Sequence, residues 1–256
     1  MNQRIINKLP EITLWFWLMK ICATTLGETA GDLLSMTMDV GYLVSSLILI
    51  GVFLVTVVAQ LITRTYQPLL YWLVILSTST AGTTMSDFMD RTLGLGYATG
   101  SLVLIILLAI VLGVWRFSVG TLSVSDIRTK PVEILYWTAI LFSNTLGTAL
   151  GDFIADDSGL GFMTGAALIG GLIGIIALGY RFTTVSRIFL FWVAFVLTRP
   201  FGAMFGDLLT KSHEKGGLNF GTIGSSATLA VMLIALIAYT MWRQGQAGRQ
   251  HQVSSV

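Results

Sequence analysis

Long apolar runs alternate with short polar connections along the whole chain. Eight stretches of about twenty mostly apolar residues lie at about 11–33, 41–62, 68–88, 97–117, 132–153, 162–181, 187–208 and 221–242. About twenty residues of helix cross the hydrocarbon core of a bilayer, which is roughly 30 Å thick. Backbone groups must be hydrogen-bonded internally at that depth, and no stretch alternates as a barrel strand does. The pattern therefore predicts an all-α polytopic membrane protein with eight transmembrane helices.

Every second stretch carries the same two markers. A Trp is followed fifteen residues later by an Asp, in Trp17–Asp32, Trp72–Asp87, Trp137–Asp152 and Trp192–Asp207. A marker that recurs at a regular period indicates tandem repeats. We expect four repeats, at about 8–62, 66–117, 129–182 and 184–243, within one transmembrane domain that spans residues 1–256.

Each repeat is expected to be a helical hairpin. Two crossings return the chain to its starting side, so the four hairpins are parallel and should surround an axis along the membrane normal with pseudo-symmetry. The longer connection at 117–131 predicts that the repeats group two plus two. We expect the Trp residues to act as packing anchors or interfacial residues rather than to stack on a ligand.

Basic residues predict the orientation. Ten lie at the chain ends or between repeats, namely Arg4, Lys8, Arg64, Arg116, Arg128, Lys130, Arg181, Arg187, Arg243 and Arg249. Three lie in the loops inside repeats, namely Arg91, Lys211 and Lys215. By the positive-inside rule, both termini are cytoplasmic and the loops inside repeats face outward with their acids, Asp39, Asp90, Asp156, Asp157 and Glu214. The polar tail at 244–256 is expected to be flexible and cytoplasmic.

Composition supports membrane residence and excludes several other classes. The chain is 54% hydrophobic and 11% charged, against about 25% charged in an ordinary soluble domain. A single cysteine, Cys22, excludes a disulfide scaffold. The scattered basic residues form no nucleic-acid patch. No nucleotide-binding or hydrolase motif occurs, so we expect neither an enzyme nor a cofactor. The first apolar run is expected to stay as a membrane anchor rather than to be cleaved as a signal peptide.

Small residues form a stripe along each first helix. At six, ten and fourteen residues after the Trp stand Ala23-Gly27-Gly31, Thr78-Gly82-Ser86, Ser143-Gly147-Gly151 and Thr198-Gly202-Gly206. Steps of four keep these positions on one face, where small residues let helices approach closely in lipid. This face should pack the first helices together or against their partners. Glycines of the second helices, at 100, 113, 165, 170, 171 and 174, should mostly serve packing too.

A polar stripe runs beside it. At seven, eleven and fifteen residues after the Trp stand Thr24-Glu28-Asp32, Ser79-Thr83-Asp87, Asn144-Thr148-Asp152 and Arg199-Ala203-Asp207. Ionisable groups at membrane depth normally face a bundle interior or a water-filled cavity. Because parallel repeats place equivalent residues at equal depth, the four aspartates are expected to ring an axis or to line one cavity.

The charge balance of this stripe favours a functional role. Glu28 and the four aspartates face only two bases, Lys20 and Arg199. Arg199 is expected to pair with one of the acids, and Lys20 to form an ion pair or to snorkel. Some carboxylates would then remain unpaired or protonated, as cation and proton pathways require. The alternative is structural, with each Asp accepting hydrogen bonds from backbone N–H groups near its helix end.

The chain resembles a family of bacterial integral membrane proteins built from four tandem copies of a repeat of unknown function. Each copy in that family has two transmembrane segments and a characteristic Trp, matched here by Trp17, Trp72, Trp137 and Trp192. The resemblance implies this architecture over about residues 8–243 and a multi-pass protein of the bacterial inner membrane. It implies no activity.

The residues themselves favour a transporter or channel for a small cation, divalent or proton-coupled. Its pathway would use Asp32, Asp87, Asp152 and Asp207, with Glu28, Asn144, Thr83 and Thr148 close by and Lys20 and Arg199 as charge partners. The four aspartates are the candidate ligands of a bound divalent cation, because oxygen donors suit magnesium, calcium or manganese. The expected partners are the lipid bilayer and the cation, without nucleic acid, and an oligomer is compatible with the sequence. A structural or partner-binding membrane protein is the main alternative, followed by an intramembrane enzyme.

Overall fold

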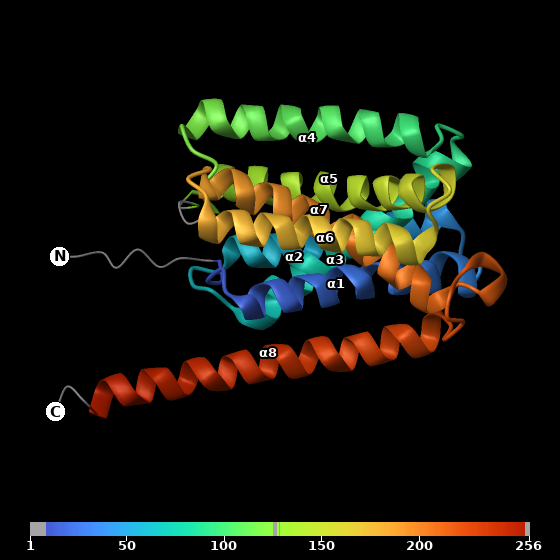
Figure 1. Cartoon of the computed structure of the whole chain (residues 1–256). Helices are drawn as coiled ribbons and strands as arrows, with labels where there is room; N and C mark the ends of the chain where they lie inside the picture. Colours follow the sequence, from blue (N-terminus) through green and yellow to red (C-terminus); the bar gives the residue numbers. More distant parts are fainter. Residues whose placement is uncertain (1–8, 125–126, 128, 254–256) are drawn as a thin grey trace.

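The described part of the chain forms eight α-helices in the computed structural model (Figure 1). The structure describes the backbone of residues 9–124, 127 and 129–253, and the side chains of these residues as far as 246. The helices are α1 (Leu14–Asp32), α2 (Tyr42–Ile62), α3 (Pro68–Asp87), α4 (Tyr97–Val119), α5 (Lys130–Asp152), α6 (Gly161–Phe182), α7 (Arg187–Thr210) and α8 (Thr222–Val253). The predicted all-helical fold is confirmed, and the described part of the chain contains no strand.

The four first helices, α1, α3, α5 and α7, pack on one another in a closed ring. Each contacts the next in chain order, and α7 contacts α1. The second helices lie outside this ring, each against the first helix of the following repeat: α2 on α3, α4 on α5, α6 on α7 and α8 on α1. The expected hairpins therefore describe the path of the chain but not its main contacts. The outer helix of each repeat packs on the inner helix of the next repeat instead.

The connections gather at two ends of the molecule (Figure 1). The loops within repeats, at 33–41, 88–96, 153–160 and 211–221, lie together at what we call the intra-repeat end. The loops between repeats, at 63–67, 120–124 and 183–186, lie with the start of α1 and the end of α8 at the inter-repeat end. Short π-helical turns extend three of the first helices into the intra-repeat loops, at Leu33–Thr37 (η1), Phe88–Thr92 (η2) and Phe153–Asp157 (η4).

The small-residue stripe closes the ring, as the sequence predicts. A Cβ on Gly27 would overlap Ser79 of α3, and one on Gly147 would overlap Arg199 of α7. The other two seams are built in the same way, since Gly82 faces Asn144 and Gly202 faces Thr24. The position ten residues after each Trp thus touches the position seven residues after the Trp of the next repeat. The absence of side chains on the stripe lets the backbones meet.

Glycines of the second helices divide into two groups. Gly100, Gly165 and Gly170 pack against side chains of neighbouring segments. The packing role expected for the others is wrong, because added Cβ atoms on Gly113, Gly171 and Gly174 would meet nothing within 4 Å. These three lie on outer helices, where no neighbouring helix covers them.

Within the described residues, five helices are long and apolar enough to cross a membrane, namely α2, α4, α6, α7 and α8. The outer helices expose large apolar side chains, such as Val55, Ile175 and Val231, which suit contact with lipid. Within the described residues, the helices α1, α3 and α5 are not apolar enough to be counted with these five. Their polar stripes are enclosed by the ring, so these helices need less apolar surface of their own.

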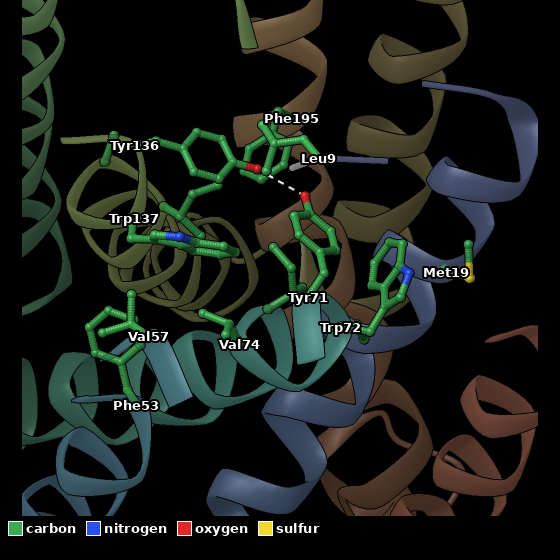
Figure 2. Close-up of a cluster of buried hydrophobic side chains, with 14 of the residues drawn as sticks. Leu9, Met19, Phe53, Val57, Tyr71, Trp72, Val74, Tyr136, Trp137 and Phe195 are labelled. Atoms are coloured by element: carbon green, nitrogen blue, oxygen red, sulfur yellow. Dashed lines mark hydrogen bonds between the residues drawn. The ribbon is translucent and has the colours of Figure 1, made fainter. Parts of the chain in front are cut away.

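Aromatic and aliphatic side chains form a buried cluster among the helices (Figure 2). The hydroxyl groups of Tyr71 and Tyr136 are hydrogen-bonded at 2.9 Å, and Phe195 and Leu9 lie beside them. Trp72 and Trp137 are each 1% exposed, as parts of the same cluster. A packing role for the repeat tryptophans is therefore confirmed at these two positions.

Candidate functional site

The four repeat aspartates form a buried carboxylate layer near the intra-repeat end. Asp32, Asp87 and Asp152 are the last residues of α1, α3 and α5, and Asp207 lies one turn before the end of α7. All four are at most 3% exposed. The equal spacing from each Trp sets this common depth, because a helix rises about 1.5 Å per residue.

Arg91 bridges two members of the layer. It lies in η2, four residues after Asp87, and its Nε is 3.0 Å from Oδ1 of that residue. Its Nη2 is 3.1 Å from Oδ2 of Asp152, in the next repeat. Burial lowers the pKa of the guanidinium, but the two carboxylates outweigh burial and leave the pKa above its ordinary value. Arg91 therefore stays charged.

Lys211 bridges the other two members in the same manner. It follows Asp207 by four residues, with Nζ 3.1 Å from Oδ1 of that residue and 2.7 Å from Oδ2 of Asp32. The pKa of Lys211 is lowered by burial but raised overall by these two aspartates. Repeats two and four thus each supply a base that binds its own Asp and the Asp of the following repeat.

The charge partners that the sequence proposed for this stripe, Lys20 and Arg199, are not the bases that bind the aspartates. Arg91 and Lys211, which the sequence identified only as bases of the loops within repeats, pair with the carboxylates. Each member of the layer therefore has a basic partner. Asp32, Asp87 and Asp152 make no side-chain capping bond at the turns that follow them, which gives the helix-cap alternative no support at these three positions. The four-residue spacing from Asp87 to Arg91 and from Asp207 to Lys211 was the signal that could have revealed these pairs.

A second polar group lies inside the ring, next to the layer along the inner helices. Arg199 is fully buried, and its Nη1 donates to Oε2 of Glu28 at 2.9 Å. Its Nη2 donates to Oγ1 of Thr83 at 2.6 Å and to Oγ1 of Thr148 at 2.7 Å. Both threonines also donate to Glu28. The expected pairing of Arg199 with an acid is confirmed, and the two threonines are brought to it from α3 and α5.

Lys20 neither pairs with an acid nor snorkels. It is fully buried, and Nζ donates to Oδ1 of Asn144 at 3.3 Å. The same ammonium group lies 4.1 Å from the centre of the Phe195 ring, within the usual range of a cation–π contact. Asn144 in turn donates to Thr78 at 2.8 Å. No ion pair joins Lys20 to a carboxylate of the described residues, and its contacts are with Asn144 and the Phe195 ring.

Asp90 is another acid that the sequence placed in an outward loop. It is 5% exposed, accepts a hydrogen bond from Oγ of Ser86 at 3.2 Å, and lies against Gly100 at the start of α4. Burial raises the pKa of Asp90 to about 6, although Ser86 and Arg91 act to lower it. Asp90 is thus buried within the loop that the sequence expects on the outer side of the membrane.

Three carboxylates are close enough to bind one metal ion together. Glu28, Asp32 and Asp207 offer oxygen atoms that lie within 4.8 Å of one another. Asp87 and Asp152 belong to no such group in the described part of the chain. The geometry thus groups Glu28 with two of the four aspartates that the sequence proposed as metal ligands. All-oxygen donors of this kind suit hard divalent cations.

Four segments of the chain match the family described as Repeat of Unknown Function (DUF347), at residues 15–66, 70–121, 135–186 and 190–246. The chain belongs to the DUF347 family. The predicted membership and the four internal repeats are both confirmed. Each DUF347 match contains one inner helix and the outer helix that follows it. No curated protein and no solved structure matches the chain.

Proposed function

We propose that this DUF347 protein is a transporter or channel for a small cation, with the carboxylate layer as the binding station. The observation that carries the proposal is the charge of this layer. Four aspartates share two bases, which leaves an excess of two negative charges in a layer whose aspartate residues are each at most 3% exposed. Uncompensated charge is costly in such surroundings. Two protons or one divalent cation would neutralise it.

Arg91 and Lys211 control how cations from the solvent reach the aspartates. Their side chains are 30% and 17% exposed, whereas those of the carboxylates that they bind are 3–4% exposed. They thus lie between the aspartates and the solvent of the intra-repeat end. A cation that enters from this end competes with the charged side chains of Arg91 and Lys211 for the same carboxylate oxygens. When a base swings away, its pair of aspartates is free to accept a proton or metal ion.

The membrane arrangement belongs to the same proposal. All eight helices would cross the bilayer, with pseudo-symmetry about the membrane normal and with both termini in the cytoplasm of a bacterial inner membrane. Exposed bases support this orientation, since the inter-repeat end carries Arg64, Arg116, Lys130, Arg181, Arg187 and Arg243. Of the three bases expected at the opposite end, Arg91 and Lys211 pair with aspartates, and Lys215 is exposed there.

A structural role is the second candidate, and the ion pairs favour it. Each base ties together two neighbouring repeats, and the Arg199–Glu28 pair joins the last repeat to the first. In this alternative the charged groups fix the order of the ring and nothing passes through it. The two candidates differ in what a neutral side chain of the same shape would do.

Substitution of aspartate by asparagine separates the candidates. We would compare Asp87→Asn and Asp152→Asn with the exposed control Asp39→Asn, whose backbone φ of 55° asparagine readily adopts. Each purified protein would be reconstituted into vesicles and tested for proton, magnesium, calcium and manganese flux, with yield and thermal stability measured separately. The proposal expects flux in the unaltered protein and the control, and its loss or altered pH dependence in well-folded layer variants. Normal flux in both layer variants would refute the role of the layer.

A further inference from the structure

A deep groove opens on the side of the helix bundle, away from the carboxylate layer. Its volume is about 560 Å³, and it lies between the first halves of α1 and α7, the second half of α6 and residues 122–124. This places it in the inter-repeat half of the molecule. Because α6 packs on α7 whereas α8 packs on α1, the seam between α1 and α7 is left without an outer helix over it here.

The walls of the groove are almost entirely apolar. Ile21, Ile176 and Phe191 contribute to its lining, and the small side chains of Ala177 and Ala194 make room for its volume. Leu14, at the outer edge, is 71% exposed. An apolar surface of this shape is unfavourable in water but is readily filled by hydrocarbon in a bilayer.

Among the described residues that line the groove, Arg187 is the charged one, and it lies at the inter-repeat end. Arg187 is the first residue of α7, is exposed, and holds its guanidinium 5.0 Å from the ring centre of Tyr180. Tyr180 lines the groove as well and is 52% exposed. Glu11 stands two residues before Thr13 of the lining but is not part of the wall. The groove thus has a mainly apolar lining and a positively charged residue at its inter-repeat end.

We propose that this groove binds a phospholipid with an anionic headgroup. An acyl chain lies along the apolar wall, and the phosphate meets Arg187 at the level where the bilayer becomes polar. Arginine suits this contact because its planar guanidinium donates two parallel hydrogen bonds to phosphate. A groove of about 560 Å³ favours a flexible chain over a second copy of this protein, which would need a broad complementary surface.

A lipid in the groove would lie against the contact between α1 and α7. Thr198 lines the inner end of the groove, and the carbonyl oxygen of Thr198 accepts a hydrogen bond from Oγ1 of Thr24 at 3.2 Å. This bond joins α7 to α1, the seam at which the last repeat meets the first. A lipid held against this seam stabilises closure of the ring, and it does so whether or not the carboxylate layer conducts ions.

Lipid binding to the full-length protein in detergent tests the proposal. Native mass spectrometry and thermal unfolding would be measured with phosphatidylglycerol and with phosphatidylcholine of the same chains. A basic residue near the surface contributes about 1 kcal/mol toward an anionic lipid, which is roughly a fivefold preference. We expect this preference in the unaltered protein, its loss in Arg187→Gln, and its retention in Arg64→Gln, which alters an exposed base of the same end.

A second pair of variants tests the chain site. Ala177→Leu adds three carbon atoms to the wall of the groove and should weaken retention of either lipid, whereas Ala109→Leu, on the exposed face of α4, should not. Equal binding of the two lipids by the unaltered protein would overturn the proposal. So would undiminished lipid binding in Ala177→Leu, or a dimer that this variant converts to a monomer, because the groove would then seat a second copy.

Discussion

Replacement of Gly147 by alanine tests the close packing of the ring most directly. The added Cβ would overlap Cβ and Cγ of Arg199, and it would lie 3.0 Å from Cδ of Pro200. Neither neighbour is the free end of a flexible chain. Arg199 is fully buried and holds Glu28 at 2.9 Å, so moving its stem also disturbs that ion pair. Alanine at this position therefore acts on packing and on charge together.

The expected loss in the free energy of unfolding of Gly147→Ala follows from these two effects. Overpacking of a well-filled interior costs about 1–3 kcal/mol, and loss of one partner of a buried ion pair costs about 3–5 kcal/mol. Because Arg199 would be displaced rather than removed, we expect a loss of about 2–5 kcal/mol. Gly174→Ala is the matched control, since its Cβ meets nothing within 4 Å. Alanine there should stabilise α6 by up to about 1 kcal/mol through helix propensity.

Denaturant unfolding of the purified proteins in mixed micelles, followed by circular dichroism, would measure both effects. The two variants should shift the free energy of unfolding in opposite directions. Leucine should give the same order with larger effects, and Gly202→Leu should behave like Gly147→Leu because a Cβ on Gly202 would overlap Thr24. If Gly147→Ala and Gly174→Ala were equally stable, the argument that bare backbones close the ring would be wrong.

Three further predictions concern the charged groups. Arg91→Gln should lower the free energy of unfolding by about 2–4 kcal/mol near neutral pH, with partial recovery in acid as the two freed aspartates take up protons; a loss independent of pH would contradict the pairing. Because burial raises the pKa of Asp90 to about 6, the folded state loses stability as pH rises from about 4 to 6, on the order of 2 kcal/mol; thermal unfolding of Asp90→Asn should lack this pH dependence. In a Cys22→Ser background, a membrane-impermeant thiol reagent should label Glu214→Cys in intact cells but not Thr65→Cys, and the reverse result would invert the proposed orientation.

Local periodicity determined much of this protein. Apolar runs of about twenty residues predict helices wherever they occur, and all eight were found. The four-residue step from Gly147 to Gly151 and the fixed Trp-to-Asp spacing are also relations between residues of one and the same helix. They therefore identified the packing face and the common depth of the aspartates without knowledge of any neighbour.

The partners across the ring were decided only by the tertiary structure. The i,i+4 pair of Asp87 and Arg91 is visible in the sequence, but the second bond of Arg91 reaches 61 residues along the chain, to Asp152. Lys211 reaches 179 residues to Asp32 in the same way. Such contacts depend on which helix follows which around the ring and on the turn that swings a loop residue inward. Neither is encoded in the spacing of one helix, and so only the tertiary structure identifies these two loop bases as the counter-ions of the buried aspartates.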